Sequence, residues 1–172
     1  SIILKPSIVY SVDDNFTTNF MRLLNILPIM PLYYSGKTKF TPIHVSDFAD
    51  IIFEIAEKKI NSQTIECIGP QVFTFKEIIL KILKSINKKR LLIPIPLVLA
   101  KMNAKLFQLM PKPLLTMDQL KLLKYDNIYS NKYKTNFDLN MPANKKFDDE
   151  IKLYSYNWTS GGQFSKKISK GN

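Results

Sequence analysis

The segment that most constrains the fold is an apolar, β-branched run at residues 2–10, which reads Ile-Ile-Leu-Lys-Pro-Ser-Ile-Val-Tyr. Nearly continuous runs of this kind are typical of strands buried on both faces of a parallel sheet. A parallel strand needs neighbours that come from elsewhere in the chain or from another chain. We therefore expect an α/β fold, and we expect the chain to begin inside a domain. Alone, such a chain is predicted to be unstable, to aggregate through its open edge, or to require a partner.

Strands and amphipathic helices alternate after this run. Further strands are predicted near residues 31–34, 40–45 and 64–68, and helices at residues 16–27, 46–59 and 74–86. Thr74 with Glu77, and Thr116 with Gln119, match the capping box that opens a helix. This order favours an α/β architecture. Beyond residue 128 the pattern fades, so we expect a weakly ordered extension at 129–158 and a disordered tail at 159–172.

The composition of the chain limits the classes of partner molecule that we expect. The chain has 172 residues and a net charge of +11, yet only Arg22 and Arg90 are arginines. Arginine is the residue best suited to bidentate phosphate recognition, so we expect a solvated basic surface and no specific nucleic-acid partner. The lone Cys67 excludes an internal disulfide framework and indicates a reducing compartment. No signal peptide and no apolar run long enough to span a membrane is recognised.

Three segments carry a family resemblance. Residues 4–10, 40–50 and 65–77 contain Leu-Lys-Pro-Ser-Ile-Val-Tyr, Phe-Thr-Pro-Ile-His-Val-Ser-Asp-Phe-Ala-Asp and Ile-Glu-Cys-Ile-Gly-Pro followed by Thr-Phe-Lys-Glu. Together they resemble the C-terminal half of an extended short-chain dehydrogenase/reductase, of the NAD-dependent epimerase/dehydratase superfamily. Residues 13–16 (Asp-Asp-Asn-Phe), 92–96 (Leu-Ile-Pro-Ile-Pro) and 115–120 (Leu-Thr-Met-Asp-Gln-Leu) most resemble the dehydrogenase-like accessory subunit of NADH:ubiquinone oxidoreductase (complex I) and its bacterial relatives.

The resemblance implies a fold and a cofactor. Residues 1–128 would form the C-terminal part of a Rossmann-like domain that lacks its N-terminal nucleotide-binding half, and NADP or NAD would bind only with that half. Pro6, Ser7 and Ile8 match the strand end that lies against the nicotinamide, so we predict that they line the cofactor pocket; the alternative is a core strand. Lys5 stands where the family commonly has Arg, and Ser11 where it commonly has Gly.

Catalytic motifs are not found. The five glycines of the chain form no Gly-x-Gly-x-x-Gly after a first strand. Tyr33 and Lys37 have the Tyr-x-x-x-Lys spacing, but Pro31 and Gly36 predict a turn rather than a shared helix face. We therefore predict no catalytic residue in this chain.

His44 is the only histidine, and two roles remain open for it. It could face a substrate cleft, or it could be structural, beside Asp47 as a cap or first-turn acid of the following helix. A single histidine without a partner at ligand spacing predicts no metal site. We expect the carboxylates at Asp13–Asp14 and at residues 148–150 to be solvated.

Residues 91–115, from Leu91 to Leu115, contain only three charges, all lysines. This segment is predicted to be an interaction surface, packed on a core or on a partner protein, or lying at a membrane surface. The partners implied by the resemblance are complex I subunits or an N-terminal half-protein. The implied location is the bacterial cytoplasm or the cytoplasmic face of the inner membrane, or alternatively the matrix face of the mitochondrial inner membrane.

Three functions are compatible with these patterns. The first is a non-catalytic, NADP(H)-binding accessory or assembly module of complex I. The second is the substrate lobe of an NAD(P)-dependent epimerase, dehydratase or reductase. The third is a decayed split-gene fragment without function.

Overall fold

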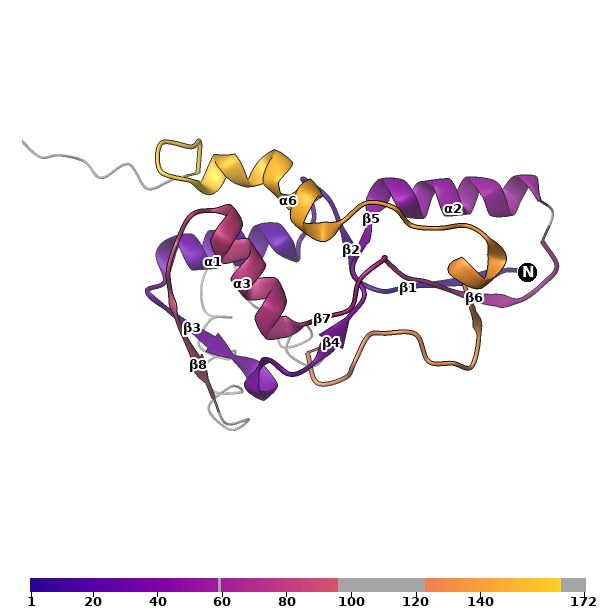
Figure 1. The fold of residues 1–172 in the computed structure, drawn as a ribbon, viewed down its shortest axis with the longest axis horizontal. Helices are drawn as coiled ribbons and strands as arrows, with labels where there is room; N and C mark the ends of the chain where they lie inside the picture. Colours follow the sequence, from indigo (N-terminus) through magenta and orange to yellow (C-terminus); the bar gives the residue numbers. More distant parts are fainter. Residues whose placement is uncertain (59, 96–122, 165–172) are drawn as a thin grey trace, which may run out of the picture.

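The computed structural model describes residues 1–58, 60–95 and 123–164, which form helices and short strands in alternation (Figure 1). The elements, in chain order, are β1 (Ile3–Pro6), β2 (Val9–Tyr10), α1 (Thr17–Ile26), β3 (Ile29–Leu32), η1 (Tyr33–Gly36), β4 (Lys39–Phe40), β5 (Ile43–His44), α2 (Val45–Glu57), β6 (Thr64–Cys67), β7 (Phe73–Thr74), α3 (Phe75–Ser85), β8 (Leu91–Pro94), β9 (Lys134–Thr135), η2 (Phe137–Leu139), α6 (Phe147–Ser155) and η3 (Tyr156–Trp158).

The strands pair mainly in parallel, which confirms the predicted α/β class. β1, β6 and β9 form a three-stranded parallel sheet, and two further parallel pairs join β2 to β5 and β3 to β8. β4 and β7 form an antiparallel pair. Strands far apart in sequence are thus brought together by crossovers that contain helices, as parallel pairing requires.

The run at residues 2–10 is not one strand buried on both faces, and that prediction is wrong. It divides into β1 and β2 at Ser7 and Ile8, and the side chain of Ile3 is 55% exposed. Ile2 and Leu4 are half-buried against the α2 side of the sheet, while Ile3 points away from it. Burial on both faces fails because, among the described residues, the hydrophobic cluster that contains α2 packs on one face of β1 only.

Three predicted helices are confirmed as α1, α2 and α3. The Thr74 hydroxyl accepts from the Glu77 backbone N–H at 3.2 Å, and the Glu77 carboxylate accepts from the Thr74 N–H at 2.7 Å. This reciprocal capping box opens α3 as the sequence predicts. The second predicted capping box, Thr116 with Gln119, lies outside the described residues, as does most of the segment 91–115.

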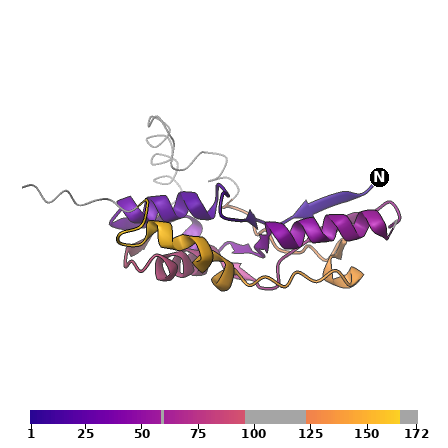
Figure 2. The ribbon, with the colours of Figure 1, turned by 90° about the horizontal axis from the view of Figure 1, so that it is seen from above.

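A helical lobe, formed by α1, α3, α6 and η3, contains the larger hydrophobic core. Phe20, Leu24, Phe75, Ile79 and Ile151 are all buried in it. In Figures 1 and 2, α1 and α6 lie side by side, with α3 packed against both. The lobe buries apolar faces from both ends of the chain, including α6, which the fading pattern after residue 128 did not predict.

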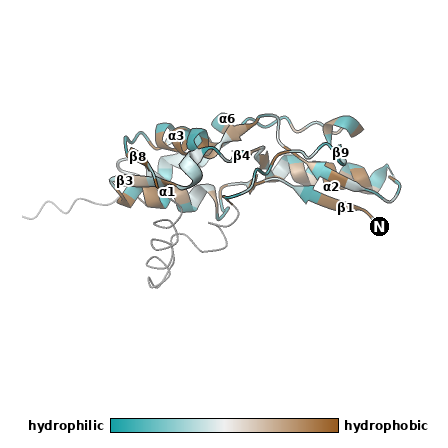
Figure 3. Cartoon of the chain, turned by 90° about the horizontal axis from the view of Figure 1, so that it is seen from below, coloured by the Kyte–Doolittle hydropathy of each residue, from teal (hydrophilic) through white to brown (hydrophobic). Residues whose placement is uncertain are grey.

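A sheet region, formed by β1, β6, β9 and α2, occupies the other end of the molecule (Figure 1). Its smaller core joins Ile51 and Ile55 of α2 to Ile43, Ile65 and Cys67. Figure 3 shows the hydrophobic colour of β1 continuing to the N-terminus beside α2. The sheet region therefore covers one face of β1 and leaves apolar surface on the other.

Candidate functional site

The predicted cofactor-lining residues lie where β1 ends and β2 begins. Ser7 is buried, and its hydroxyl donates to the Asn127 carbonyl at 2.8 Å and accepts from the Thr41 N–H at 3.2 Å. Pro6 is exposed and Ile8 is half-buried. Ser7 therefore joins three chain segments and has no hydroxyl proton left for a ligand, while Pro6 and Ile8 present only apolar surface.

Gly69 holds these strand ends together by close approach. A Cβ atom at Gly69 would lie 1.7 Å from the Pro42 carbonyl oxygen, closer than any side chain permits. The Gly69 N–H donates to the Thr41 carbonyl at 3.1 Å. The turn after β6 can thus contact the segment between β4 and β5 only because residue 69 lacks a side chain.

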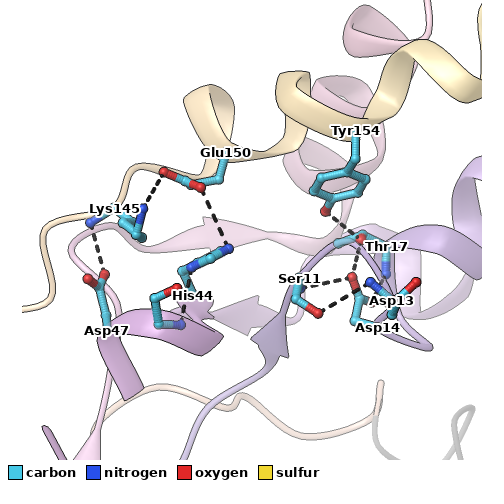
Figure 4. Close-up of polar contacts among 10 residues, drawn as sticks. Ser11, Asp13, Asp14, Thr17, His44, Asp47, Lys145, Glu150 and Tyr154 are labelled. Carbon is cyan, nitrogen blue, oxygen red and sulfur yellow. Dashed lines mark hydrogen bonds and ion pairs between the residues drawn. The ribbon is translucent and has the colours of Figure 1, made fainter. Parts of the chain in front are cut away.

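His44 is fixed at the start of α2. Its Nδ1 accepts from the Ser46 backbone N–H at 3.2 Å, so the imidazole itself is the N-cap (Figure 4). Asp47 is therefore not the cap of this helix, and it stands in the first turn, the other position considered for it. The ring of Tyr10 contacts the imidazole edge to face, with centroids 5.2 Å apart.

The other side of His44 faces α6. Its Nε2 lies 3.6 Å from the Glu150 carboxylate, which also accepts from the Lys145 ammonium at 3.0 Å (Figure 4). The buried Asp47 carboxylate accepts from the Lys145 backbone N–H at 2.9 Å. These contacts tie the segment before α6 to the start of α2, so the expectation that Glu150 is solvated is wrong.

Burial dominates the electrostatics of His44. Desolvation lowers the pKa of its imidazole below the ordinary 6.5, and the Glu150 carboxylate offsets only part of this decrease. The neutral imidazole is the form that accepts from Ser46. The capping contact agrees with the structural role, one of the two roles left open for His44, and the substrate-cleft role stays a prediction.

A second polar contact joins α6 to the N-terminal part of the chain, at the start of α1. The Asp14 Oδ1 accepts from the N–H groups of Phe16 and Thr17, each at 2.5 Å, and thereby caps this helix. The Thr17 hydroxyl lies 2.9 Å from the hydroxyl of Tyr154 on α6 (Figure 4). Burial raises the pKa of Asp14. Asp14 is therefore a partly buried cap and not a solvated loop residue, which corrects the prediction made for it.

α6 and its contacts to the N-terminal part of the chain were not predicted from the sequence. The signal that could have found α6 is the spacing of Phe147, Ile151, Tyr154 and Trp158, which places one apolar side chain on the same helix face at each turn. All four are buried. The three polar residues at 144–146 and the three acids at 148–150 obscured this stripe.

The cysteine at the end of β6 is not an activated nucleophile. Cys67 is buried, and burial raises the pKa of its thiol to about 11, so the thiol is protonated at neutral pH. Tyr33 and Lys37 flank a tight turn in which Tyr34, Ser35 and Gly36 all have positive φ. They share no regular helix, as the sequence analysis predicted.

The fit to a dinucleotide cofactor is partial. Pro6 and Ile8 could form an apolar wall for a nicotinamide ring, but the Ser7 hydroxyl is already engaged. The sequence supplies no glycine-rich turn for the pyrophosphate. This chain therefore cannot hold a whole dinucleotide with the residues described, and at most it contributes one wall.

The described residues contain neither a metal-binding cluster nor a membrane-spanning helix. No group of three or more His, Cys, Asp or Glu side chains that could hold a metal ion occurs within residues 1–58, 60–95 and 123–164. Over those same residues, none of the helices has the length and apolar character needed to span a membrane.

No family model and no curated protein matches the sequence, whereas many solved structures match the fold. Among them are UDP-glucose 4-epimerase from Thermus thermophilus in complex with NAD, with a TM-score of 0.59, 14% identity, and coverage of 91% of this chain and 46% of the epimerase. GDP-mannoheptose C4 reductase from Campylobacter jejuni with NADP bound has a TM-score of 0.59, 15% identity, and coverage of 91% and 48%.

A third match is a GDP-D-glycero-L-gluco-heptose synthase from Campylobacter jejuni, solved in the presence of NADPH, with a TM-score of 0.58, 13% identity, and coverage of 91% and 52%. The chain spans about half the length of the solved structures it matches. At these identities the likeness concerns the fold. The chain has the α/β, Rossmann-like fold of part of the NAD(P)-binding epimerases, dehydratases and reductases.

Proposed function

We propose that this chain is the C-terminal portion of a nicotinamide-nucleotide-binding protein of short-chain dehydrogenase fold, and that it acts as a non-catalytic accessory or assembly component of complex I. The nucleotide, NADP or NAD, would be held mainly by a nucleotide-binding half, with Pro6, Ser7 and Ile8 as one wall of the nicotinamide pocket. Its place would be the cytoplasmic face of a bacterial inner membrane, or the matrix face in mitochondria.

The observation that carries the proposal is the unpaired edge of β1. The N–H groups of Ile3 and Ser7 donate to Gln63 and Cys67, each at 3.0 Å, so alternate residues of the strand face β6. Leu4, between them, directs its N–H to the opposite edge, where no described strand pairs. Parallel sheets in α/β proteins are normally covered and continued. A strand of the nucleotide-binding half is the complement we infer for this edge.

A non-catalytic role is supported by how the polar side chains near the strand ends are used. The Ser7 hydroxyl and the His44 imidazole both form hydrogen bonds to the backbone of other segments or of α2. The link to complex I rests on the sequence resemblance at residues 13–16, 92–96 and 115–120. The Leu91 to Leu115 segment is the surface we propose for contact with complex I subunits or the membrane.

The edge can be tested with a matched pair of substitutions. The chain is produced with the nucleotide-binding half encoded with it, and NADPH binding is measured by calorimetry. Leu4→Pro removes the outward N–H of β1 and should weaken binding at least tenfold, about 1.4 kcal/mol, whereas Leu4→Ala should leave it nearly unchanged. Micromolar binding by the isolated chain, or equal binding by both variants, would contradict the proposal.

The role in complex I needs a test in the cell of origin. Deleting the gene should reduce assembled complex I on native gels and lower NADH:ubiquinone oxidoreductase activity in membranes, and restoring the intact gene should return both. Normal complex I in the deletion strain would overturn this part of the proposal.

A second candidate is the substrate lobe of an NAD(P)-dependent epimerase, dehydratase or reductase, because the matched structures are enzymes of these kinds. The sequence of the nucleotide-binding half would distinguish this enzyme role from the accessory role. An intact Tyr-x-x-x-Lys pair there, with turnover of a nucleotide sugar by the assembled protein, would favour the enzyme.

A further inference from the structure

A groove separates one face of α1 from the segment that follows α6. Its volume is about 640 Å³, within the range of small-molecule sites. The α1 wall is a stripe of residues at helical spacing that runs from Asn15 through Arg22 to Ile26, and the facing wall is formed by Trp158, Gln163 and Phe164. The groove walls belong to the helical lobe, whereas β1 belongs to the sheet region at the other end of the ribbon (Figures 1 and 2).

The groove combines an apolar floor with a polar rim that, among the described residues, contains no acidic side chain. Trp158 is 7% exposed and packs against Phe164 with ring centroids 4.9 Å apart. Ile26 and Phe164 are 46% and 52% exposed, so apolar surface remains open to a ligand. The rim consists of the Arg22 guanidinium together with amide and hydroxyl groups. Such a lining suits a ligand that is apolar at one end and negatively charged at the other.

Arg22 has unused binding capacity. Its Nη2 donates to the Asn19 side-chain oxygen at 2.7 Å, but its Nε is buried and has no hydrogen-bond partner. Within the described residues, no carboxylate forms an ion pair with Arg22. Because the Nε is enclosed by the chain, a ligand in the groove would contact the terminal Nη groups of the guanidinium, for which a carboxylate or phosphate is the matching acceptor.

The walls are held in place by contacts that do not use Arg22. The buried Asn25 donates from its side-chain amide to the Phe164 carbonyl at 2.7 Å and accepts from the Lys88 ammonium. The Thr17 to Tyr154 contact fixes α6 beside α1. The groove is therefore formed before any ligand arrives, which reduces the entropic cost of binding.

We propose that this groove binds a small amphipathic anion, with a carboxylate or phosphate head at Arg22 and an aliphatic or aromatic body on Ile26, Trp158 and Phe164. The site is separate from the predicted cofactor wall at Pro6–Ile8 and does not depend on the proposed function. A free metabolite or a membrane lipid could each supply this chemistry.

Trp158 is the only tryptophan of the chain, so its fluorescence reports on the groove directly. Octanoate and octyl phosphate should change the emission saturably, whereas octanol and inorganic phosphate should each bind at least about tenfold more weakly. Phosphatidylglycerol vesicles test the lipid source: a response to vesicles alone, lost on substitution of Arg22, assigns the ligand to a membrane lipid. No response to any of these anions would overturn the proposal.

Substitutions separate a built site from nonspecific binding. Arg22→Gln should weaken binding of octyl phosphate about tenfold, while Lys152→Gln, which removes an exposed charge elsewhere, should not. Because Arg22→Gln could disturb folding, the pair Ile26→Glu and Ile26→Gln gives a second test at an exposed position. Only the glutamate should repel the anion. Equal affinities for this pair would refute the proposed site.

Discussion

The helical lobe and the sheet region differ in how far they bury their hydrophobic side chains. In the lobe, Phe75, Ile78, Ile79 and Ile82 on α3 are fully buried by helices from both ends of the chain. In the sheet region, β1 contains no buried residue and exposes Ile3. The described part of the lobe thus encloses a fully buried core, whereas the sheet region leaves an edge and a face of β1 without a described partner.

The largest expected effect is at the centre of the buried core of the lobe. Phe75 is fully buried and stacks edge to face on Phe20 with centroids 5.2 Å apart. Phe75→Ala should lower the free energy of unfolding by about 3–5 kcal/mol, measured by urea denaturation followed by circular dichroism. Phe53→Ala, at a 62% exposed position on α2, is the matched control and should change it by less than about 0.5 kcal/mol. Similar losses in both variants would contradict the division into these two regions.

The next effect concerns the junction of the two regions. Gly69→Ala would place a methyl group 1.7 Å from the Pro42 carbonyl oxygen, so the backbone must shift. We expect a loss of about 1–3 kcal/mol in the same denaturation experiment. Gly161→Ala meets no atom within 4 Å and is strained only by its φ of +89°, so its cost should be smaller. An equal or larger cost at Gly161 would mean that the close contact at Gly69 can relax.

A smaller effect tests the capping of α3. Thr74→Ala removes the hydroxyl that accepts from Glu77 and should cost about 1 kcal/mol. Thr74→Ser keeps the hydroxyl and should recover most of this stability. If the serine variant is no more stable than the alanine variant, the cap contributes little and tertiary packing alone holds the start of α3.

The sequence predicted those features whose causes lie within a few residues of one another. The capping box of Thr74 and Glu77 and the apolar stripes of α1, α2 and α3 are local, and the structure contains them. The tight turn at Tyr34–Gly36 was likewise readable from Pro31 and Gly36. These elements were sufficient to predict an α/β fold.

The features that sequence reasoning missed depend on contacts between distant segments. Ser7 leaves the strand pattern because it bonds to Asn127 and Thr41. Glu150 is partly buried because α6 returns to His44, more than a hundred residues earlier. No local sequence pattern encodes such long-range contacts. A charged residue that becomes buried by one of them cannot be distinguished in the sequence from a solvated charged residue. The sequence therefore predicted which residues belong to the candidate site, but not which of them contact one another.

The smallest expected effect is a pH dependence at His44, which lies where α6 meets the start of α2. The folded chain holds the pKa of His44 below 6.5, so the unfolded chain binds a proton more readily. The free energy of unfolding should therefore fall as the pH decreases from about 7 through 6.5 toward the pKa of the folded state. His44→Asn keeps a side chain that can cap α2 but does not titrate, and it should flatten this slope.

Thr74→Ala is the control for this slope, because it lowers stability without removing a group that titrates between pH 5 and 7. The groups that face the imidazole are Glu150 and Lys145 from the α6 side and Asp47 from α2. Their charges act in opposite directions, and desolvation is the larger cause, so acid should destabilise the wild-type chain relative to His44→Asn. If acid instead stabilises it in urea titrations at pH 7, 6 and 5, the ion pair with Glu150 outweighs burial, and His44 would fasten the two regions most strongly in its charged form.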